Sequence, residues 1–368
     1  MFLNIDLRKQ CEFFGFTENH ENESILIFHG CSTNLNVDGD SVGDYITDCN
    51  ELHIGNTPRS IMTKGTSTRR KNRLPGYLYR NFDPGNEDKL MISYRRERSH
   101  DYRMDSACGV SYKGEMHFFG GKRWWNRDYS RQHFSIETRR SEQLVKLLKK
   151  EDLTIGFEDS SCSIFANAVI LCFDFDHSQS CHLFDDKLTY IGDSKYNHDF
   201  GGLTRYKHSL LTIGGLIDGN QKTEMMKRNK NGTFTWSVVE PNFQFSADDA
   251  ISDHSLVTIE SNDMHDEYVL LIGGYAADTS KDVFKFNGTW SSFGQLNKPR
   301  YYHKSIYWDG AVYVIGGIHN EYDQNTKMEI WKIDDSPDHF QTTEKWPELF
   351  NWQVPHLFIV PDSFFPDH

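Results

Sequence analysis

Short hydrophobic runs recur along the chain between polar stretches, and several of them end in a pair of glycines. Four such runs are MHFFGG (116–121), LLTIGG (210–215), VLLIGG (269–274) and VYVIGG (312–317). A short hydrophobic run that is bounded by turn signals predicts a β-strand. Glycine is favoured where strands converge, because it lacks a Cβ and allows close backbone approach and a positive φ.

The spacing of these runs predicts a repeat protein. Two weaker runs, ILIFHG (25–30) and VILCFD (169–174), lack one or both glycines. We place the second glycine or its equivalent near residues 30, 121, 172, 215, 274 and 317, and the last five positions are spaced by 51, 43, 59 and 43 residues. A period of about 40–50 residues is typical of β-propellers, in which each blade has four strands.

Two Asn-Gly pairs lie between strand-like runs, in KNGTF (230–234) and FNGTW (286–290). Asn-Gly is a strong signal for a tight β-hairpin turn. Both NGT triplets, and NES at 22–24, also fit the Asn-x-Ser/Thr acceptor pattern for N-glycosylation. We interpret the two NGT triplets as hairpin turns and keep glycosylation as the alternative.

The stretch 296–334 resembles a kelch repeat. It has the lead-in Leu296, Pro299, Arg300 and His303, then an alternating strand, Gly316-Gly317 and the strand EIWKID. The resemblance is also good in the units 250–295 and 199–247, partial in 105–157, and poor in 161–198 and before residue 100. Resemblance to kelch proteins implies a β-propeller, and six repeat units imply six blades.

We therefore expect an all-β chain that forms a six-bladed kelch-type β-propeller with four antiparallel strands per blade. Residues 1–23 would be a lead-in and residues 24–368 the propeller, with a long polar and basic insertion at 31–75 in the first blade. An isolated strand near 356–360 would complete that first blade and remove its open edge.

The charge is acidic overall and basic in one segment. The formal net charge is −13, yet residues 59–103 carry twelve Lys or Arg against five Asp or Glu. The overall acidity disfavours nucleic-acid and membrane-surface partners. The basic segment favours a protein partner with acidic patches, and we expect a monomer.

The cysteines and the start of the chain bear on location. The seven cysteines form no CxxC pair, and the start, MFLNIDLRKQ, does not read as a signal peptide. Both features favour reduced thiols and a cytoplasmic location, with Cys172 and Cys181 as small buried hydrophobic residues. If the start is incomplete, we expect an extracellular location, in which Cys172 and Cys181 could pair.

No motif in the sequence predicts catalysis. The stretch NLNVDGDSVGD (34–44) resembles a calcium loop, but Tyr45 stands where a bidentate Glu is needed. The 17 histidines include no HExxH, and the chain has no P-loop, dinucleotide fingerprint or Gly-x-Ser-x-Gly. We expect no enzyme activity, no cofactor and no metal.

The loop KRWWNRDYSR (122–131) is the best candidate binding site. It follows a glycine pair, so in a propeller it joins the second and third strands at one mouth of the channel. It is rich in Trp, Tyr and Arg, the types enriched at interface hot spots. The candidate partner-binding residues are Lys122, Arg123, Trp124, Trp125, Arg127, Tyr129 and Arg131, with His319 and Tyr322 from the equivalent loop of the last unit. The lead-in RYYH (300–303) either reaches the same face or packs between blades.

These features favour a non-catalytic protein–protein interaction scaffold that presents propeller loops to a protein partner. The kelch resemblance implies an adaptor or cytoskeletal role. One alternative is an extracellular kelch recognition module with disulfides and N-glycans. A further alternative is a metal-dependent kelch enzyme.

Overall fold

The structure is a computed structural model, and all its regular elements within the described residues are β-strands. The described residues are 23–28, 77–80, 90–92, 107–121, 131–137, 147–174, 176–216, 221–242, 245, 250–260, 266–308, 310–319, 328–333, 340–342 and 356–361. Within these residues, no helix is long and apolar enough to cross a membrane.

The strands form six four-stranded antiparallel sheets. The first, in the order β24-β1-β2-β3, contains β1 (Glu23–Phe28), β2 (Tyr77–Arg80), β3 (Leu90–Ile92) and β24 (His356–Pro361). The second contains β4 (Ala107–Tyr112), β5 (Glu115–Gly120), β6 (Gln132–Glu137) and β7 (Leu147–Asp152). The third contains β8 (Ser161–Phe165), β9 (Ala168–Asp174), β10 (His177–Phe184) and β11 (Leu188–Asp193).

Each of the remaining three sheets contains four strands that are consecutive in the chain. The fourth contains β12 (Gly202–Tyr206), β13 (Ser209–Ile213), β14 (Thr223–Arg228) and β15 (Phe234–Val238). The fifth contains β16 (Ser255–Ile259), β17 (Tyr268–Ile272), β18 (Asp282–Phe286) and β19 (Trp290–Gln295). The sixth contains β20 (Tyr301–Trp308), β21 (Ala311–Ile318), β22 (Glu329–Lys332) and β23 (Gln341–Thr342).

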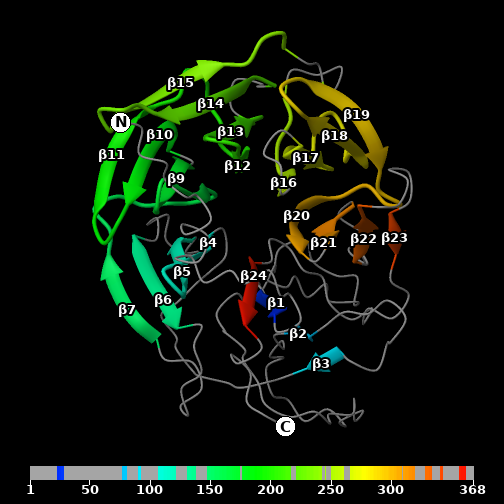
Figure 1. Cartoon of the computed structure of the whole chain (residues 1–368), viewed down its shortest axis with the longest axis horizontal. Helices are drawn as coiled ribbons and strands as arrows, with labels where there is room; N and C mark the ends of the chain where they lie inside the picture. The colour runs from blue at the N-terminus through cyan, green and yellow to red at the C-terminus, as the bar shows by residue number, and fades with distance from the viewer. Residues whose placement is uncertain are drawn as a thin grey trace, which may run out of the picture.

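The sheets are arranged around a common centre, as Figure 1 shows. The first strand of each sheet contacts the first strand of the next, in the order β24, β4, β8, β12, β16 and β20, and β20 contacts β24 in turn. The prediction of an all-β propeller with four antiparallel strands per blade is therefore confirmed. The third to sixth sheets form four blades whose side chains are described almost throughout.

The glycine pair lies where the second strand ends in three sheets, and in the sixth sheet it directly precedes Ile318, the last residue of β21. The first glycine of each pair has a positive φ, as the sequence indicates. Gly120, Gly214, Gly273 and Gly316 have φ values of 73°, 81°, 57° and 74°. At Gly214, an added Cβ would also collide with the carbonyl oxygen of Ile251 in the next sheet. The third sheet departs from the pattern, because Phe173 takes this conformation with a φ of 65°. The equivalent of the glycine pair is thus Phe173-Asp174, and the predicted position near 172 is wrong by two residues.

Apolar side chains pack between neighbouring sheets. One cluster joins Ile213 of the fourth sheet to Leu271 and Phe284 of the fifth. Another joins Ile272 of the fifth sheet to Val314 of the sixth. Because each sheet is covered by its neighbours, removal of this surface from water stabilises the ring as a whole.

Strands from both ends of the described chain share the first sheet. β24 pairs with β1 over the full length of both strands, from Glu23↔Pro361 to Phe28↔His356. Phe358 of β24 packs on Phe118 of β5, with ring centroids 5.3 Å apart. The C-terminal strand therefore connects the first sheet to the second.

Two disulfides correct the expectation of reduced thiols. Cys172 and Cys181 face each other across β9 and β10 and form a disulfide. Cys108 and Cys162 form a second disulfide between β4 and β8, with their Cα atoms 5.9 Å apart. The cysteine spacing favoured free thiols, but opposite positions on paired strands lie within disulfide reach.

Candidate functional site

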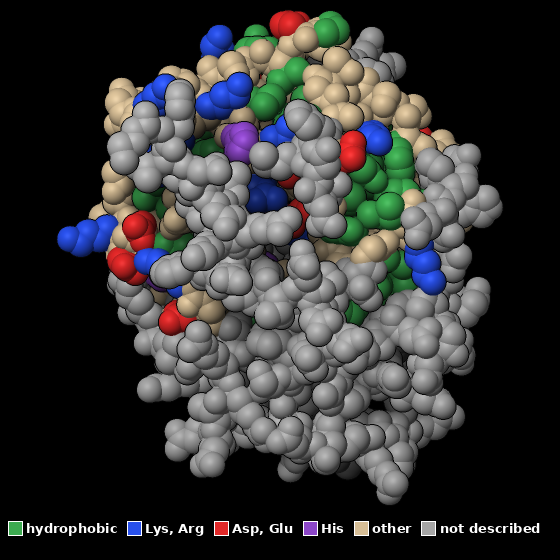
Figure 2. All heavy atoms as spheres, in the orientation of Figure 1, with side chains coloured by type: hydrophobic (Ala, Val, Ile, Leu, Met, Phe, Trp, Pro, Cys, Tyr) green, Lys and Arg blue, Asp and Glu red, His purple; other side chains and the backbone are tan. Residues whose placement is uncertain are grey.

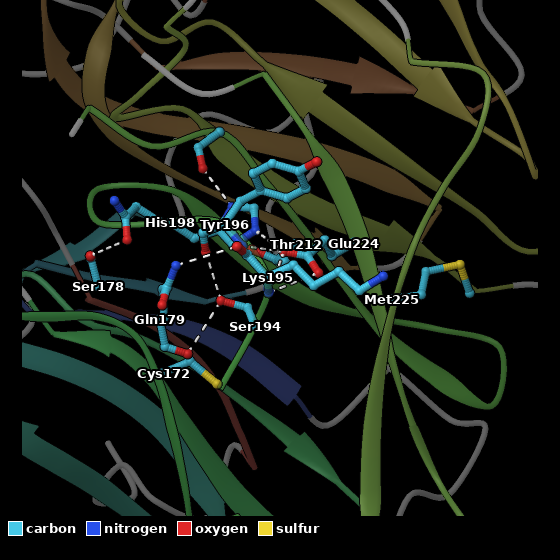
Figure 3. A network of polar contacts seen from close by, with 12 residues as sticks. Cys172, Ser178, Gln179, Ser194, Lys195, Tyr196, His198, Thr212, Glu224 and Met225 are labelled. Carbon is cyan, nitrogen blue, oxygen red and sulfur yellow. Dashed lines mark hydrogen bonds and ion pairs between the residues drawn. The ribbon is translucent and has the colours of Figure 1, made fainter. Parts of the chain in front are cut away.

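A buried polar cluster fixes the segment that enters the fourth sheet (Figure 3). The His198 ring places Nε2 3.0 Å from Glu224 Oε2 and Nδ1 2.6 Å from the carbonyl oxygen of Gly214. Glu224 also accepts hydrogen bonds from the backbone N–H groups of Lys195 (3.1 Å) and Tyr196 (3.0 Å). Both His198 and Glu224 are fully buried. We call this arrangement the entry clip, because it ties the chain before β12 to the third strand, β14.

The sixth sheet has the same clip with an arginine. Arg300 donates from Nη1 to the carbonyl oxygen of Gly316 (3.0 Å) and from Nη2 to Glu329 (2.5 Å). Glu329 accepts from the backbone N–H groups of Asn297 (2.6 Å) and Lys298 (3.2 Å). Burial lowers the pKa of Arg300, and the charge of Glu329 opposes that shift. Arg300 of the kelch-like lead-in therefore holds the blade together.

The fifth sheet replaces the charged clip by an apolar pair. The N–H of Gly215 donates to the carbonyl of Ile251, as the N–H of Gly274 donates to that of Arg300. Ile251 thus occupies the position of Arg300, and Phe284 occupies that of Glu329. Ile251 and Phe284 are buried in the same hydrophobic cluster. Both positions of the clip are therefore charged in the sixth sheet and apolar in the fifth.

A ring of left-handed residues lies two positions after each clip residue. Asp159, Phe200, Asp253 and Tyr302 have φ values of 50°, 55°, 53° and 56°. The N–H of Asp253 donates to the carbonyl of Phe200 (2.8 Å), and the N–H of Tyr302 donates to that of Asp253 (3.1 Å). Asp159, Phe200 and Asp253 lie just before the innermost strands and Tyr302 lies at the start of β20, so the four residues surround the centre of the ring. We call this region the channel mouth.

Acidic side chains and one lysine meet at the channel mouth. The pKa of Asp253 is raised to about 7, mainly by burial and also by the charges of Asp159 and Asp199. A hydrogen bond from Ser252 Oγ (3.0 Å) and the charge of Lys304 act in the opposite direction. Burial also lowers the pKa of Lys304, against the attraction of Asp253 and Asp159. Figure 2 shows basic and acidic side chains near the middle of the face drawn.

Lys304 reaches into a part of the channel that is lined by small residues. It follows His303 in β20, and the equivalent positions in the described innermost strands are Ser255, Gly202 and Ser161. Protein surrounds Lys304 on all sides, yet its side chain stays accessible to solvent through the channel. The Lys304 amine therefore interacts with the carboxylates of Asp253 and Asp159 at the channel mouth.

Three tyrosines form a rim beside this charged centre. Tyr275 directly follows the glycine pair of the fifth sheet and is 40% exposed. Its ring lies 5.6 Å from that of Tyr301, which lies 4.9 Å from the ring of Tyr302. In the fourth sheet, the equivalent of Tyr275 is Leu216, which is 48% exposed. We call Tyr275, Tyr301 and Tyr302 the tyrosine rim.

The lead-in RYYH divides between the two roles left open by the sequence. His303 is buried between sheets, with its ring against Gly273 and its Cβ against Gly317. Tyr301 and Tyr302 are partly exposed and belong to the rim. His254 occupies the position of His303 in the fifth sheet, and burial lowers its pKa to about 3. Both histidines are therefore packing residues.

Most of the predicted partner-binding residues lie outside the described residues, namely Lys122, Arg123, Trp124, Trp125, Arg127, Tyr129 and Tyr322. Arg131 is exposed before β6, and its carbonyl accepts a hydrogen bond from the N–H of Leu153. His319 follows β21, and its carbonyl accepts from Thr279 Oγ1 (2.7 Å). The described residues therefore do not test this predicted binding site.

Tyr275 and the acidic centre were not singled out from the sequence, whereas Tyr301 and Tyr302 belong to the lead-in that was considered for this face. A usable signal existed, since Tyr275 holds the place after a glycine pair that Lys122 holds in the second unit. Within the described part of the chain, no group of three or more His, Cys, Asp or Glu side chains is arranged to hold a metal ion.

Comparisons with known proteins support the propeller fold, but they assign the chain to no family. No family model matches the chain, and no curated protein matches it. Among solved structures, 177 chains match. One is the structure of YjhT, with a TM-score of 0.56 and 15% identity, covering 73% of this chain and 91% of that one. At this identity the likeness shows a shared fold alone.

Proposed function

We propose that this protein is a non-catalytic binding module that presents the channel-mouth face of a kelch-type propeller to a protein partner. The blade number we propose is six, which the six sheets and the cyclic contacts of their first strands support. The repeated clip and glycine-pair contacts support the kelch resemblance.

The tyrosine rim is the observation that carries this proposal. Tyr275 and Tyr301 expose aromatic surface at the channel mouth instead of burying it between the sheets. Tyrosine is enriched at interface hot spots, because its rigid ring gains contact area at a small cost in conformational entropy. The charged groups Asp253 and Lys304 beneath the rim add polar specificity.

We propose that the loops that the sequence singles out belong to the same face. Residues 122–131 and 318–325 follow glycine pairs, as Tyr275 does. A rigid frame that presents several loops on one face is a common architecture for binding. We propose that these loops extend the surface around the rim.

The disulfides favour the extracellular form of this proposal over the cytoplasmic one. Disulfides form and persist mainly in oxidising compartments. The second disulfide, Cys108–Cys162, joins two sheets and closes a separation of 54 residues. We therefore propose that the module works outside the cytosol, on a secreted or cell-surface partner.

The test is affinity capture from extracellular fluid with a double variant, Tyr275→Ser/Tyr301→Ser. A matched control is Tyr190→Ser, because Tyr190 is 56% exposed on the outer strand β11, away from the rim. All three proteins must first melt at similar temperatures. We expect the rim variant to lose at least tenfold of the captured partner while the control keeps it. Equal capture by both variants would contradict the proposed face.

A further inference from the structure

The two Asn-Gly-Thr triplets occupy matching places in neighbouring sheets. Asn231 lies in the turn between β14 and β15, and Asn287 lies in the turn between β18 and β19. In both sheets this hairpin joins the third strand to the outermost one. Figure 1 shows β15 and β19 at the perimeter of the molecule. Both triplets therefore lie at the outer edge, far along the sheet from the channel.

Both asparagines are accessible and surrounded by open space. Asn231 and Asn287 are exposed, as are the glycine and threonine that follow each. A Cβ added at Gly232 or Gly288 would meet nothing within 4 Å. The hairpin-turn interpretation is thus correct for both triplets, and it leaves room for a large substituent.

The acceptor nitrogens are not engaged in the fold. Asn231 Oδ1 accepts from Thr233 N (3.1 Å) and Thr233 Oγ1 (2.7 Å), and Asn287 Oδ1 accepts from Tyr206 Oη (3.3 Å). Within the described residues, no hydrogen bond uses Nδ2 of either asparagine. The nitrogen that would carry a glycan is therefore free, while the oxygen keeps the side chain in place.

We propose that Asn231 and Asn287 are N-glycosylated, so that two glycans stand on adjacent outer edges of the fourth and fifth sheets. The inference rests on the oxidising compartment of the proposed function, because Asn-x-Thr acceptors are modified in the secretory pathway. The glycans shield the perimeter of these sheets and leave the tyrosine rim open to the partner.

The experiment uses the full chain, secreted from mammalian cells behind a cleavable leader, with Asn22→Gln as background to remove the third triplet. Total protein, cell-associated and secreted, is compared before and after treatment with a peptide N-glycosidase. We expect a mobility shift equal to two glycans. Peptide mass spectrometry then finds the enzyme's conversion of Asn to Asp at positions 231 and 287.

Matched variants separate the two sites from general effects. Thr233→Ala and Thr289→Ala should each remove one glycan while keeping the asparagine, and Thr233→Ser should retain it. Asn229→Gln is the control, since Asn229 is exposed in the same turn but outside any triplet. An unshifted Asn22→Gln protein would overturn the proposal, and a single shift would overturn it for the unmodified site. Partner capture through the rim is measured separately, so its failure is distinguishable from failure of glycosylation.

Discussion

Asp253 combines two unfavourable features at one position. Its backbone has a φ of 53°, which is uncommon outside glycine but is tolerated by Asp and Asn. Its carboxyl group lies among Asp159, Asp199 and Lys304, in surroundings that raise its pKa to about 7. Backbone strain and desolvated charge are typical of functional sites, because the rest of the fold must hold them in place.

Asp253→Asn should stabilise the protein at high pH. The pKa of this acid is raised from 3.8 to about 7 in the folded state, so the folded protein holds the proton more tightly than the unfolded chain does. Its contribution to stability is present below about pH 4 and is lost as the pH rises to about 7. Asn keeps the left-handed backbone and removes the charge. We expect a melting temperature several degrees higher at pH 8 and a smaller gain at pH 5.

Thermal denaturation at both pH values checks this prediction. Asp266→Asn is the matched control, because Asp266 is an exposed aspartate of the same sheet region. Because its side chain is exposed, we expect this variant to change the melting temperature little. A gain at Asp253 that is equal at pH 5 and pH 8 would show that the carboxylate is not the cause.

At the scale of the element, the entry clip explains how one fold accepts different residues. Arg300 and Glu329 form a buried ion pair, whereas Ile251 and Phe284 fill the same positions with apolar groups. A buried pair often contributes little over a well-packed apolar pair, but removing one partner leaves a buried charge. The fifth sheet thus shows which apolar pair can take the place of the ion pair in the sixth sheet.

Glu329→Phe alone should therefore cost about 3–5 kcal/mol of unfolding free energy, because Arg300 is left buried without its carboxylate. Adding Arg300→Ile should restore part of that loss by recreating the pair found in the fifth sheet. Urea denaturation of wild type, both single variants and the double variant gives the coupling energy. A double variant less stable than Glu329→Phe alone would contradict the equivalence of the two clips.

The second strands could be predicted from the sequence because each is a short hydrophobic run with a recognisable end. VYVIGG and VLLIGG were read correctly as second strands for this reason. VILCFD was also read correctly as a strand, but the equivalent of its glycine was placed two residues too early, since Phe173 adopts the conformation expected of glycine. Asp253 and Tyr275 were not singled out, because they join Tyr301 and Tyr302 only through contacts between different sheets. The disulfide Cys108–Cys162 was missed for the same reason.

At the scale of the whole molecule, the ring is held at two neighbouring places. β24 pairs with β1 and contacts both β20 and β4, so it joins the last sheet to the first two. The Cys108–Cys162 disulfide then connects β4 to β8 in the next sheet. Because β24 lies beside β1, both sides of β1 are paired, and this strand offers no open edge for aggregation.

Phe358→Ala should reveal how much this closure contributes. Phe358 is 2% exposed, and its ring packs on Phe118 of the second sheet. Truncation of a buried Phe costs about 3–5 kcal/mol, and here the loss falls on the contact between two sheets. Leu357→Ala is the control, because Leu357 points to the opposite side of the same strand and is partly exposed. Urea denaturation should show the larger loss for Phe358→Ala, and size-exclusion chromatography should show more oligomer as the sheet edge opens. If both variants lose the same stability and remain monomeric, the ring does not depend on this strand for its closure.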